Sequence, residues 1–418
     1  MLKRISAIVM ITLLSTSLAA CGNSNSSNSS DSTSSSQASS KTTSKSGTEA
    51  SNTSADSSSV FTDRDLKQEA DTSNAKKLTL SDGKDVTITE EGVYIISGTA
   101  KDASVIVDAA DDAKVQLVLE NANITNSDSP CVYVKNADKV FVTTANGSEN
   151  TLTVSGSFTA DGDTKTDAVI FSKDDIVLNG EGTLNISSTD NGISGKDDIK
   201  ITGGTININC TADAIEANDS ISVADGNITI KTQKDGLHAE NDDDNTQGSI
   251  YISSGTFNIT AGSDGIQATT TAVIDGGTFT ISSAEGIEAT NITINDGNIT
   301  ISASDDGINA ANKSTAESVC ITINGGNIKI TMGQGDTDGI DSNGDLYITG
   351  GTVDITGQSA CDYDGKAEKT GGKLIVNGQE TDTIPNQMMG GHGGMGGGPG
   401  KMNGDMGGMN GDMGGFQR

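Results

Sequence analysis

The sequence predicts an all-β fold, a parallel β-helix in which one chain winds through stacked rungs of about 22 residues. Three observations lead to this prediction. A unit of a polar, a small and an aliphatic residue recurs from Asp167 onward, with successive copies 21 to 32 residues apart. Between the copies, aliphatic and polar residues alternate on either side of a turn that usually contains Gly, which is the pattern of short strands. Hydrophobic residues make up 33% of the chain and aromatic residues 3%, enough for a thin core and too few for several thick ones.

The recurring unit predicts where one strand of each rung begins. Its eight copies are Asp167-Ala168-Val169, Asn191-Gly192-Ile193, Asp213-Ala214-Ile215, Asp235-Gly236-Leu237, Asp264-Gly265-Ile266, Glu285-Gly286-Ile287, Asp306-Gly307-Ile308 and Asp338-Gly339-Ile340. The two longest intervals contain insertions, at 241–247 and 312–318. Each repeat has room for three short strands and three turns, and no helical period intervenes, which is typical of a solenoid rung. Each strand should pair with its counterpart one rung away, at about 4.8 Å.

The alternation also predicts which side chains fill the core. One inward column should contain Ile206, Ile228, Phe257, Phe279, Ile299, Ile328 and Val353. Phe257 and Phe279 would also suit a surface platform for sugars, but their register assigns them to the core. We expect the β-helix to extend over 78–378, about 13 rungs, with 61–77 covering its N-terminal end through a short N-capped helix.

Both ends of the chain differ in composition from the repeats. Residues 1–20 combine a basic start with a short apolar stretch and are predicted to be a signal peptide. Leu18-Ala19-Ala20-Cys21 resembles a bacterial lipobox, so we expect Cys21 to be lipidated; an ordinary secretory signal is the alternative. The serine-rich segment 21–60 and the Gly/Met-rich segment 379–418 are predicted to be a disordered linker and a disordered tail. We therefore expect a monomer that its lipid anchors to the extracellular face of the cell membrane.

The charge of the chain limits its partners. The formal net charge of −31, from 57 acidic and 26 basic residues, argues against binding nucleic acid or an anionic membrane surface through charge. Contact with a membrane is expected through the N-terminal lipid only. An excess of carboxylates is compatible with bound cations.

Many of the acids recur at one place in the rung. The acid of each unit is expected to lie outside, at a corner, and the residue three positions on should also point outward, as in the pair Asp213 and Glu216. Stacked like charges about 5 Å apart repel by about 3 kcal/mol at an effective dielectric constant near 20, so these acids must shift their pKa values, pair with lysines or bind cations. Oxygen-only ligation suits Ca²⁺. The predicted Ca²⁺ ligands are Asp213, Glu216, Asp235, Asp264, Glu285, Glu288, Asp306, Asp338 and Asp341. The alternative is an acidic, solvated corner with local Asx turns.

Several segments carry a family resemblance. The opening Phe61-Thr62-Asp63-Arg64-Asp65-Leu66, the segment Gly92-Val93-Tyr94-Ile95-Ile96-Ser97-Gly98, the segment Gly147-Ser148-Glu149-Asn150 and the repeat units resemble a family of surface-exposed β-helix lipoproteins, mostly of Gram-positive anaerobes, with carbohydrate-binding domains. The resemblance covers roughly 61–378. It implies a right-handed parallel β-helix like that of pectate lyases, bound calcium, and affinity for plant polysaccharides such as cellulose and polygalacturonate, without established catalysis.

The residues themselves favour a binding protein over an enzyme. Uronate elimination typically uses Arg or Lys as its base; no Arg occurs between Arg64 and Arg418, and no spacing singles out Lys231, Lys234 or Lys329 for that role. Asp305-Asp306 resembles the paired aspartates of β-helical polygalacturonases, but no basic substrate clamp accompanies it. We predict a non-catalytic protein that binds an acidic, pectin-like plant or cell-wall polysaccharide through calcium. Two alternatives stay open: a structural adhesin or spacer that recognises protein or cell wall, and a pectin-degrading lyase or hydrolase. The absence of Trp disfavours stacking on cellulose.

Overall fold

The computed structural model describes residues 60–335 and 337–386, and all of its named elements are strands. The predicted signal peptide 1–20, the lipobox residue Cys21, nearly all of the linker 21–60 and the tail from residue 387 onward lie outside the described residues. Within the described ranges, no helix is long and apolar enough to cross a membrane. The predicted all-β class is confirmed.

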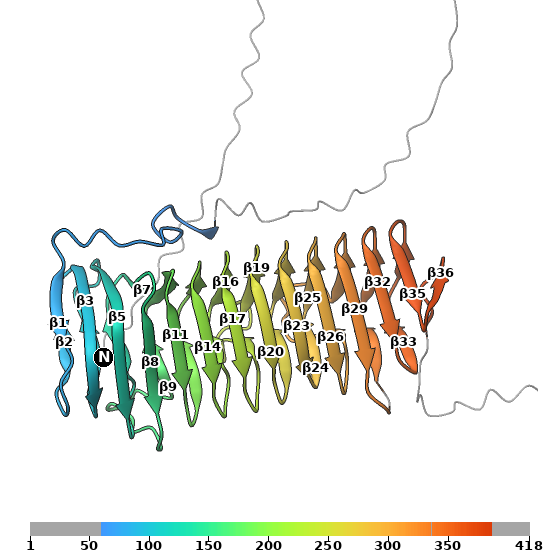
Figure 1. Cartoon of the computed structure of the whole chain (residues 1–418). Helices are drawn as coiled ribbons and strands as arrows, with labels where there is room; N and C mark the ends of the chain where they lie inside the picture. The colour runs from blue at the N-terminus through green and yellow to red at the C-terminus, as the bar shows by residue number, and fades with distance from the viewer. Residues whose placement is uncertain (1–59, 336, 387–418) are drawn as a thin grey trace, which may run out of the picture. The chain divides into compact units, whose positions relative to one another are not determined.

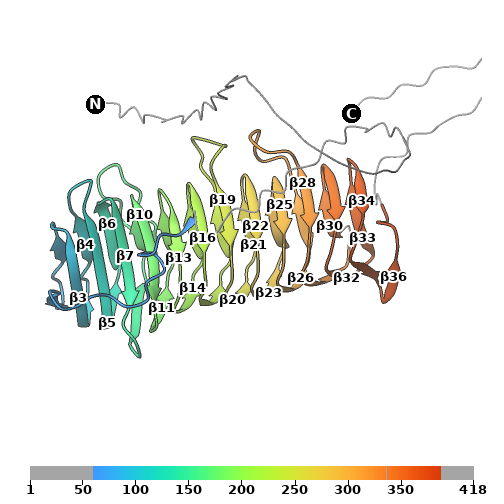
Figure 2. The same cartoon turned by 90° about the horizontal axis from the view of Figure 1, so that it is seen from above.

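The chain winds through three faces, and its strands stack along one axis (Figures 1 and 2). The first face, called the strap face below, contains β1 (Lys76–Thr79), β3 (Gly92–Lys101), β5 (Lys114–Asn126), β7 (Lys139–Thr144), β10 (Asp175–Gly180), β13 (Ile199–Ile201), β16 (Ser220–Val223), β19 (Ser249–Ile252), β22 (Thr271–Ile274), β25 (Asn291–Ile294), β28 (Cys320–Ile323), β31 (Asp345–Ile348) and β34 (Ala367–Lys369). The second, called the neutral face, contains β8 (Glu149–Val154), β11 (Thr183–Ser187), β14 (Thr205–Asn209), β17 (Asn227–Lys231), β20 (Thr256–Thr260), β23 (Thr278–Ser283), β26 (Asn298–Ala303), β29 (Asn327–Met332), β32 (Thr352–Thr356), β35 (Lys373–Val376) and β36 (Gln379–Thr381).

The third face, called the acid face, is a separate 12-stranded sheet. It contains β2 (Val86–Ile88), β4 (Val105–Asp108), β6 (Val132–Asn136), β9 (Ala168–Ser172), β12 (Asn191–Gly195), β15 (Ile215–Ala217), β18 (Leu237–Ala239), β21 (Asp264–Ala268), β24 (Glu285–Ala289), β27 (Ile308–Ala310), β30 (Asp338–Ser342) and β33 (Ser359–Tyr363). The strap and neutral faces join into one 24-stranded sheet because the long strand β5 turns the corner and pairs with both β7 and β8.

Successive rungs pair in parallel and in register, as the repeat predicts. The predicted inward column is confirmed throughout: Ile206 lies opposite Ile228, and the pairing continues to Val353. Phe257 and Phe279 are buried in it with their ring centroids 4.6 Å apart. They are core residues, which leaves no sugar platform at these positions. At the C-terminal end, β36 pairs antiparallel with β35, so it closes that edge of the neutral face.

The segment 60–68, called the strap below, differs from the expectation. We expected it to form a short helix over the N-terminal end. Residues 63–66 form a turn instead, and the strap lies across the strap face (Figure 1). There the ring of Phe61 packs against the ring of Tyr251 of β19, with the ring centroids 6.2 Å apart. Gln68 bridges two strands, since its amide donates to Thr202 O at 2.8 Å and its carbonyl oxygen accepts from Gly180 N at 2.9 Å. The strap therefore ties several rungs together from the side.

A buried carboxylate explains where the strap lies. Asp65 is completely buried, and its nearest cations are Lys139 at 3.7 Å and Lys200 at 3.8 Å, which point outward from β7 and β13. Burying a carboxylate is tolerable only beside opposite charge and hydrogen-bond donors, and Thr62 N also donates to it at 2.9 Å. These lysines lie several rungs from the N-terminal edge, so the strap is drawn to the middle of the strap face.

Candidate functional site

The acids of the repeat unit are more buried than we expected. Asp213, Asp235 and Asp264 are only 5%, 8% and 9% exposed, so the expectation of acids lying outside at a corner is wrong for them. The cause is a ladder along the axis of the solenoid. Asp235 N donates to Asp213 Oδ1 at 3.0 Å, and Asp264 N donates to Asp235 Oδ1 at 2.8 Å. One oxygen of the carboxylate in each rung therefore accepts a hydrogen bond from the backbone of the next rung.

The same ladder recurs further along the acid face. Asp338 N donates to Asp306 Oδ1 at 2.9 Å, so these two predicted ligands hold neighbouring rungs together. The glycine that follows the acid allows this close stacking. A Cβ atom on Gly286 would lie 2.3 Å from Gly307 O and 2.6 Å from a methyl carbon of Ile301. Close approach of backbone and core, rather than a sharp bend, explains why the unit contains Gly there.

The register of the predicted second column, three residues after the acid, is confirmed, but Gln267, Glu288 and Asn309 in it are as buried as the acids. The register runs through Glu216, His238, Gln267, Glu288, Asn309, Asp341 and Asp362. The two columns are adjacent on the acid face, so carboxylates gather where both positions are acidic. Among the described residues, three groups of His, Cys, Asp or Glu ligand atoms come close enough to hold a metal ion.

The central cluster consists of three predicted ligands, Asp264, Glu285 and Glu288. One carboxylate oxygen from each lies within 4.8 Å of the others. Burial, followed by the charges of Asp235, Glu285 and Glu288, raises the pKa of Asp264 to about 8. Burial and the charge of Glu288 raise the pKa of Glu285 to about 7. These carboxylates therefore resist ionising together unless a cation joins them.

The histidine cluster consists of Asp213, Asp235 and His238. His238 Nδ1 lies 3.5 Å from Asp213 Oδ2 and 3.6 Å from Asp235 Oδ2, while Nε2 lies 3.0 Å from Glu240 Oε2. Burial opposes protonation of the ring, but Asp213, Asp235 and Glu240 outweigh it and raise the pKa of His238 to about 9. The imidazolium thus supplies a positive charge between two of the predicted calcium ligands.

The other predicted ligands are distributed differently. Glu216 is not part of a cluster: its Oε2 accepts from Asn191 at 2.6 Å and from Ser194 at 3.1 Å, and its other oxygen lies 4.0 Å from Lys196. Asp341 lies near further acids, and burial together with Asp306, Asp338, Asp362 and Asp364 raises its pKa to about 7. In the part of the chain that is described, Asp306, Asp338 and Asp341 do not form a compact three-ligand group.

The third group was not predicted. This outer cluster consists of Asp175, at the start of β10, with Asp197 and Asp198, in the turn before β13. Burial, followed by the charges of Asp175, Asp198 and Asp219, raises the pKa of Asp197 to about 6. The sequence carries a signal for it, because Lys173-Asp174-Asp175 recurs one repeat later as Lys196-Asp197-Asp198. We read only the acid-Gly unit and missed this second recurrence.

The donor chemistry of the central cluster fits a hard divalent cation. All three ligand groups are carboxylates, and Ca²⁺ prefers oxygen ligands at about 2.3–2.6 Å. A fourth oxygen is nearby: Asn309 donates its amide to Glu285 at 3.0 Å, while its buried Oδ1 has no hydrogen-bond partner. An unpartnered buried carbonyl oxygen beside carboxylates is the feature that a cation would satisfy. The histidine cluster fits less well, because its imidazolium already provides a cation.

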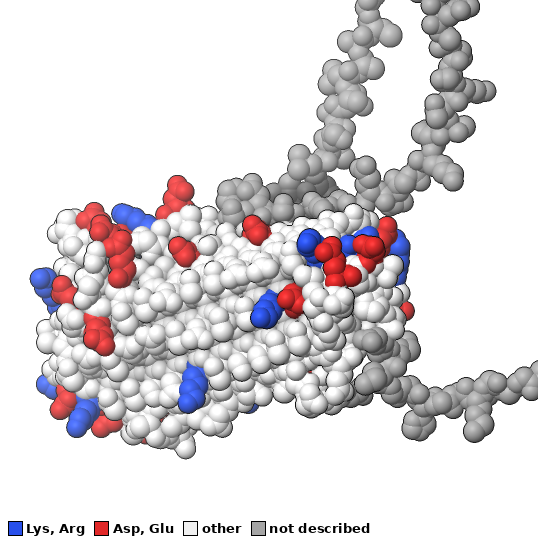
Figure 3. All heavy atoms as spheres, turned by 45° about the vertical axis from the view of Figure 1, so that its right-hand side comes forward, with Lys and Arg blue, Asp and Glu red and all other residues white. Residues whose placement is uncertain are grey.

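The neutral face carries a second candidate surface, which the sequence reading overlooked. Its outward positions from β8 to β32 form three columns in register. Among these outward side chains only Glu149, Lys231, Lys329 and Asp354 are charged, and the others are Thr, Ser or Asn. Figure 3 shows a broad strip with few charged atoms on this side of the molecule. The sequence signal for this surface was the alternation of the strands, whose outward residues are mostly Thr, Ser and Asn. We had used the alternation only to assign the inward residues.

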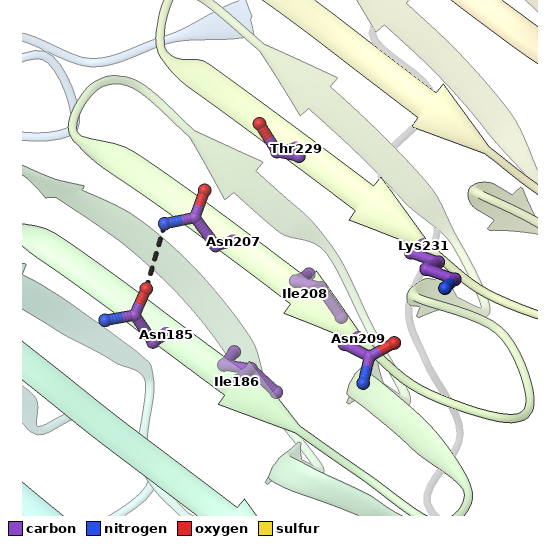
Figure 4. Close-up of a pocket in the computed structure, with 7 residues that line it drawn as sticks. All are labelled: Asn185, Ile186, Asn207, Ile208, Asn209, Thr229 and Lys231. Atoms are coloured by element: carbon purple, nitrogen blue, oxygen red, sulfur yellow. Dashed lines mark hydrogen bonds between the residues drawn. The ribbon is translucent and has the colours of Figure 1, made fainter.

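One part of the neutral face is hollowed. Asn185, Ile186, Asn207, Ile208, Asn209, Thr229 and Lys231 line a shallow depression of about 590 Å³ (Figure 4). Asn207 Nδ2 donates to Asn185 Oδ1 at 2.9 Å, which orders the two amides (Figure 4). Hydroxyl and amide groups arrayed in this way can both donate to and accept from a hydroxyl-rich ligand. The tyrosines of the described residues, Tyr94, Tyr133, Tyr251, Tyr347 and Tyr363, lie on the other two faces and form no stacking stripe.

Together these features define a parallel β-solenoid with one acidic face and one polar face that carries few charges. The chain belongs to the family of carbohydrate-binding domain-containing proteins, whose sequence model matches residues 82–337 and 284–387. This confirms the carbohydrate-binding family expected from the motifs.

Two known proteins are similar to the chain. A carbohydrate-binding domain-containing protein of Acetivibrio thermocellus is 39% identical over 133 residues, which make up 31% of this chain and 46% of that protein. The chain thus matches about half the length of this relative. The gadolinium derivative of a polysaccharide lyase-like protein from C. thermocellum is 26% identical, and the match covers 72% of this chain and 96% of that one, with a TM-score of 0.34.

Proposed function

We propose that this protein is a non-catalytic, cell-surface polysaccharide-binding protein that holds an acidic polysaccharide, such as polygalacturonate, through calcium on its acid face. The central cluster carries this proposal: Asp264, Glu285 and Glu288 converge beside the unpartnered oxygen of Asn309. A chain with a net charge of −31 repels a polyanion unless divalent ions link the two. Calcium held on this face would present open coordination positions to the carboxylates of the polysaccharide.

The surroundings of the acids support binding without catalysis. Arg64, the only arginine of the described residues, lies 4.4 Å above the ring of Phe141 on the strap face, away from the acid face. Each of the three acid clusters has a lysine beside it, and these lysines are paired: Lys313 with Glu288, Lys234 with Asp213 and Lys139 with Asp175. One oxygen of Asp306, in the pair that resembles a hydrolase dyad, already accepts a backbone hydrogen bond. A lyase or hydrolase, and an adhesin or spacer, are the alternatives to this proposal.

The proposal includes the predicted anchoring. Lipidation of Cys21 would fix the protein to the extracellular face of the cell membrane as a monomer. The serine-rich linker 21–60 would then give the solenoid reach away from the membrane.

A pull-down with insoluble pectate tests the calcium bridge. We expect the protein to bind pectate in millimolar calcium and to be released by EDTA. The double variant Asp264→Asn/Glu288→Gln should lose most of the calcium-dependent binding, since it removes two of the three clustered carboxyl groups. The variant Asp112→Asn/Glu120→Gln removes the same charge from exposed positions near the N-terminal end and should bind as the wild type does. Pectate binding that survives EDTA would contradict the bridge.

The neutral face favours a second candidate ligand, a neutral polysaccharide bound through hydrogen bonds without calcium. Two new carboxylates at its centre, Asn258→Glu/Thr280→Glu, should weaken binding to insoluble neutral glucan about tenfold, since they replace groups that hydrogen-bond and are costly to desolvate. The matched control Thr293→Glu/Thr322→Glu places the same charges in register on the strap face. Equal binding of neutral glucan by both variants would reject this candidate while leaving the acid face untouched.

A further inference from the structure

A lysine from an insertion reaches the central cluster. The connection 311–319, between β27 and β28, folds back over the preceding rung, where Lys313 Nζ lies 2.6 Å from Glu288 Oε2. Thr290 holds this connection in place, since its Oγ1 accepts from the backbone N of Lys313 at 3.1 Å and of Ser314 at 2.9 Å. The ammonium group is therefore positioned by the fold and is not a freely moving surface charge.

The second insertion meets the first. Ser314 is almost completely buried, and its hydroxyl donates to Asn245 O at 2.5 Å. Asn245 belongs to the connection 240–248, between β18 and β19, so the two insertions touch across the rungs that lie between them. Figure 2 shows both connections projecting from the same side of the solenoid. The rungs between them are those that supply the central cluster.

Charge balance around the cluster depends on this lysine. Lys313 Nζ contacts Glu288, and a carboxylate oxygen of Glu288 lies within 4.8 Å of oxygens of Asp264 and Glu285. One ammonium group can offset only one of three carboxylates, so full ionisation of the cluster needs a further positive charge. A divalent ion and the ammonium group cannot both contact Glu288 without strong mutual repulsion. The two cations therefore compete for the same carboxylate.

We propose that Lys313 is a tethered cation that occupies the central cluster when calcium is absent, and that a calcium ion must displace it from Glu288 to bind. This inference rests on the proposed calcium-dependent function and adds regulation to it. The unpartnered Oδ1 of Asn309 lies beside the same carboxylates and supports a vacant ligand position there. An ammonium group, which can only donate hydrogen bonds, can also approach this oxygen. Displacement frees the side chain that pins one insertion against the acid face. Calcium loading would thereby be coupled to the contact between the two insertions.

Calorimetric titration of the full chain with calcium alone tests this proposal. Lys313→Met should raise the calcium affinity of one site about tenfold, because calcium no longer displaces a bound cation. In EDTA the same variant should melt at a lower temperature than the wild type, and calcium should raise its melting temperature by more. Lys313→Arg, which keeps the charge, should leave the affinity near that of the wild type, and adding Glu288→Gln should abolish the gain of Lys313→Met. Lys329→Met, which removes a charge from the neutral face, is the matched control.

Unchanged calcium affinity in Lys313→Met would overturn the proposal, and so would an equal gain in Lys329→Met. If Lys313→Met folds poorly, Lys313→Gln provides the same test, since it also removes the ammonium group. The pectate pull-down separates this inference from the proposed function. Calcium-dependent pectate binding with no effect of Lys313 would reject only the tethered cation. A tenfold gain in calcium affinity without any pectate binding would reject only the polysaccharide.

Discussion

Raising the pH from about 5 to about 9 in a calcium-free buffer is expected to lower the melting temperature of this protein substantially. Four acid-face groups have raised pKa values in the folded state: Asp264 at about 8, Glu285 and Asp341 at about 7, and His238 at about 9. In each case the folded chain keeps a proton that the unfolded chain releases at lower pH. Stability therefore falls as the pH rises, by about 1.4 kcal/mol per pH unit for each extra proton held.

The pH window follows from the individual groups. The carboxyl contributions are complete below their ordinary pKa values of 3.8 to 4.5 and are lost as the pH passes about 7 to 8. The contribution of His238 is complete below 6.5 and is lost as the pH passes about 9. All four effects have the same sign, so they add. Calcium should oppose the loss, because it stabilises the ionised carboxylates.

Thermal unfolding across this pH range, with EDTA and with millimolar calcium, measures the effect. Asp264→Asn/Glu285→Gln should flatten the pH profile in EDTA, since two of the titrating groups are gone. Asp112→Asn/Glu120→Gln lowers the overall negative charge equally and should keep the profile of the wild type, which separates the local effect from general charge repulsion. A melting temperature that rises with pH in EDTA would show that the acid-face pKa values are not raised.

Removing the buried carboxylate of the strap is the second change with a large expected effect. Asp65→Ala should destabilise the folded protein by about 3–5 kcal/mol, the usual cost of breaking a buried ion pair from one side. Lys139 would keep its ion pair with Asp175, in which Nζ lies 3.2 Å from the carboxylate. Among the described residues, no acid other than Asp65 forms an ion pair with Lys200. The hydrogen bond from Thr62 N would also be lost. We expect the strap to detach from the strap face and the segment that follows it to become sensitive to protease.

The control for this prediction is Asp63→Ala, two residues earlier in the same turn. Asp63 is exposed, so its removal should change the melting temperature little. Differential scanning calorimetry gives the melting temperatures, and limited proteolysis followed by mass spectrometry locates the cuts. If Asp65→Ala melts and resists protease as the wild type does, Asp65 does not hold the strap.

Much of the fold could be predicted because the solenoid is built from local periodicity. The spacing of Phe257 and Phe279 in successive repeats placed them in one core column, and the structure stacks their rings there. The same periodicity placed Glu216 and His238 in one outward column, as observed. A residue in a regular repeat has its neighbours set by the length of the repeat, so counting along the chain is enough to find them.

The candidate site could be predicted only in part. The repeat brought Asp264, Glu285 and Glu288 to one place, and the structure gathers all three. It did not show that a lysine from an insertion would reach Glu288, because the path of an insertion does not follow the period. It also did not show that Glu216 would be drawn to Lys196 and Asn191 instead of to a cluster.

The sequence by itself determined the rung, the strand register and the inward and outward columns of this protein, since all of these follow from one repeat length and the two-residue period of a strand. Only the tertiary structure decided where the strap lies, how deeply the acids are buried and which of them gather into clusters. Those features depend on contacts between segments far apart in the chain, such as Asp65 with Lys200 and Ser314 with Asn245. Charge and burial choose such partners in three dimensions, and no repeat length encodes them.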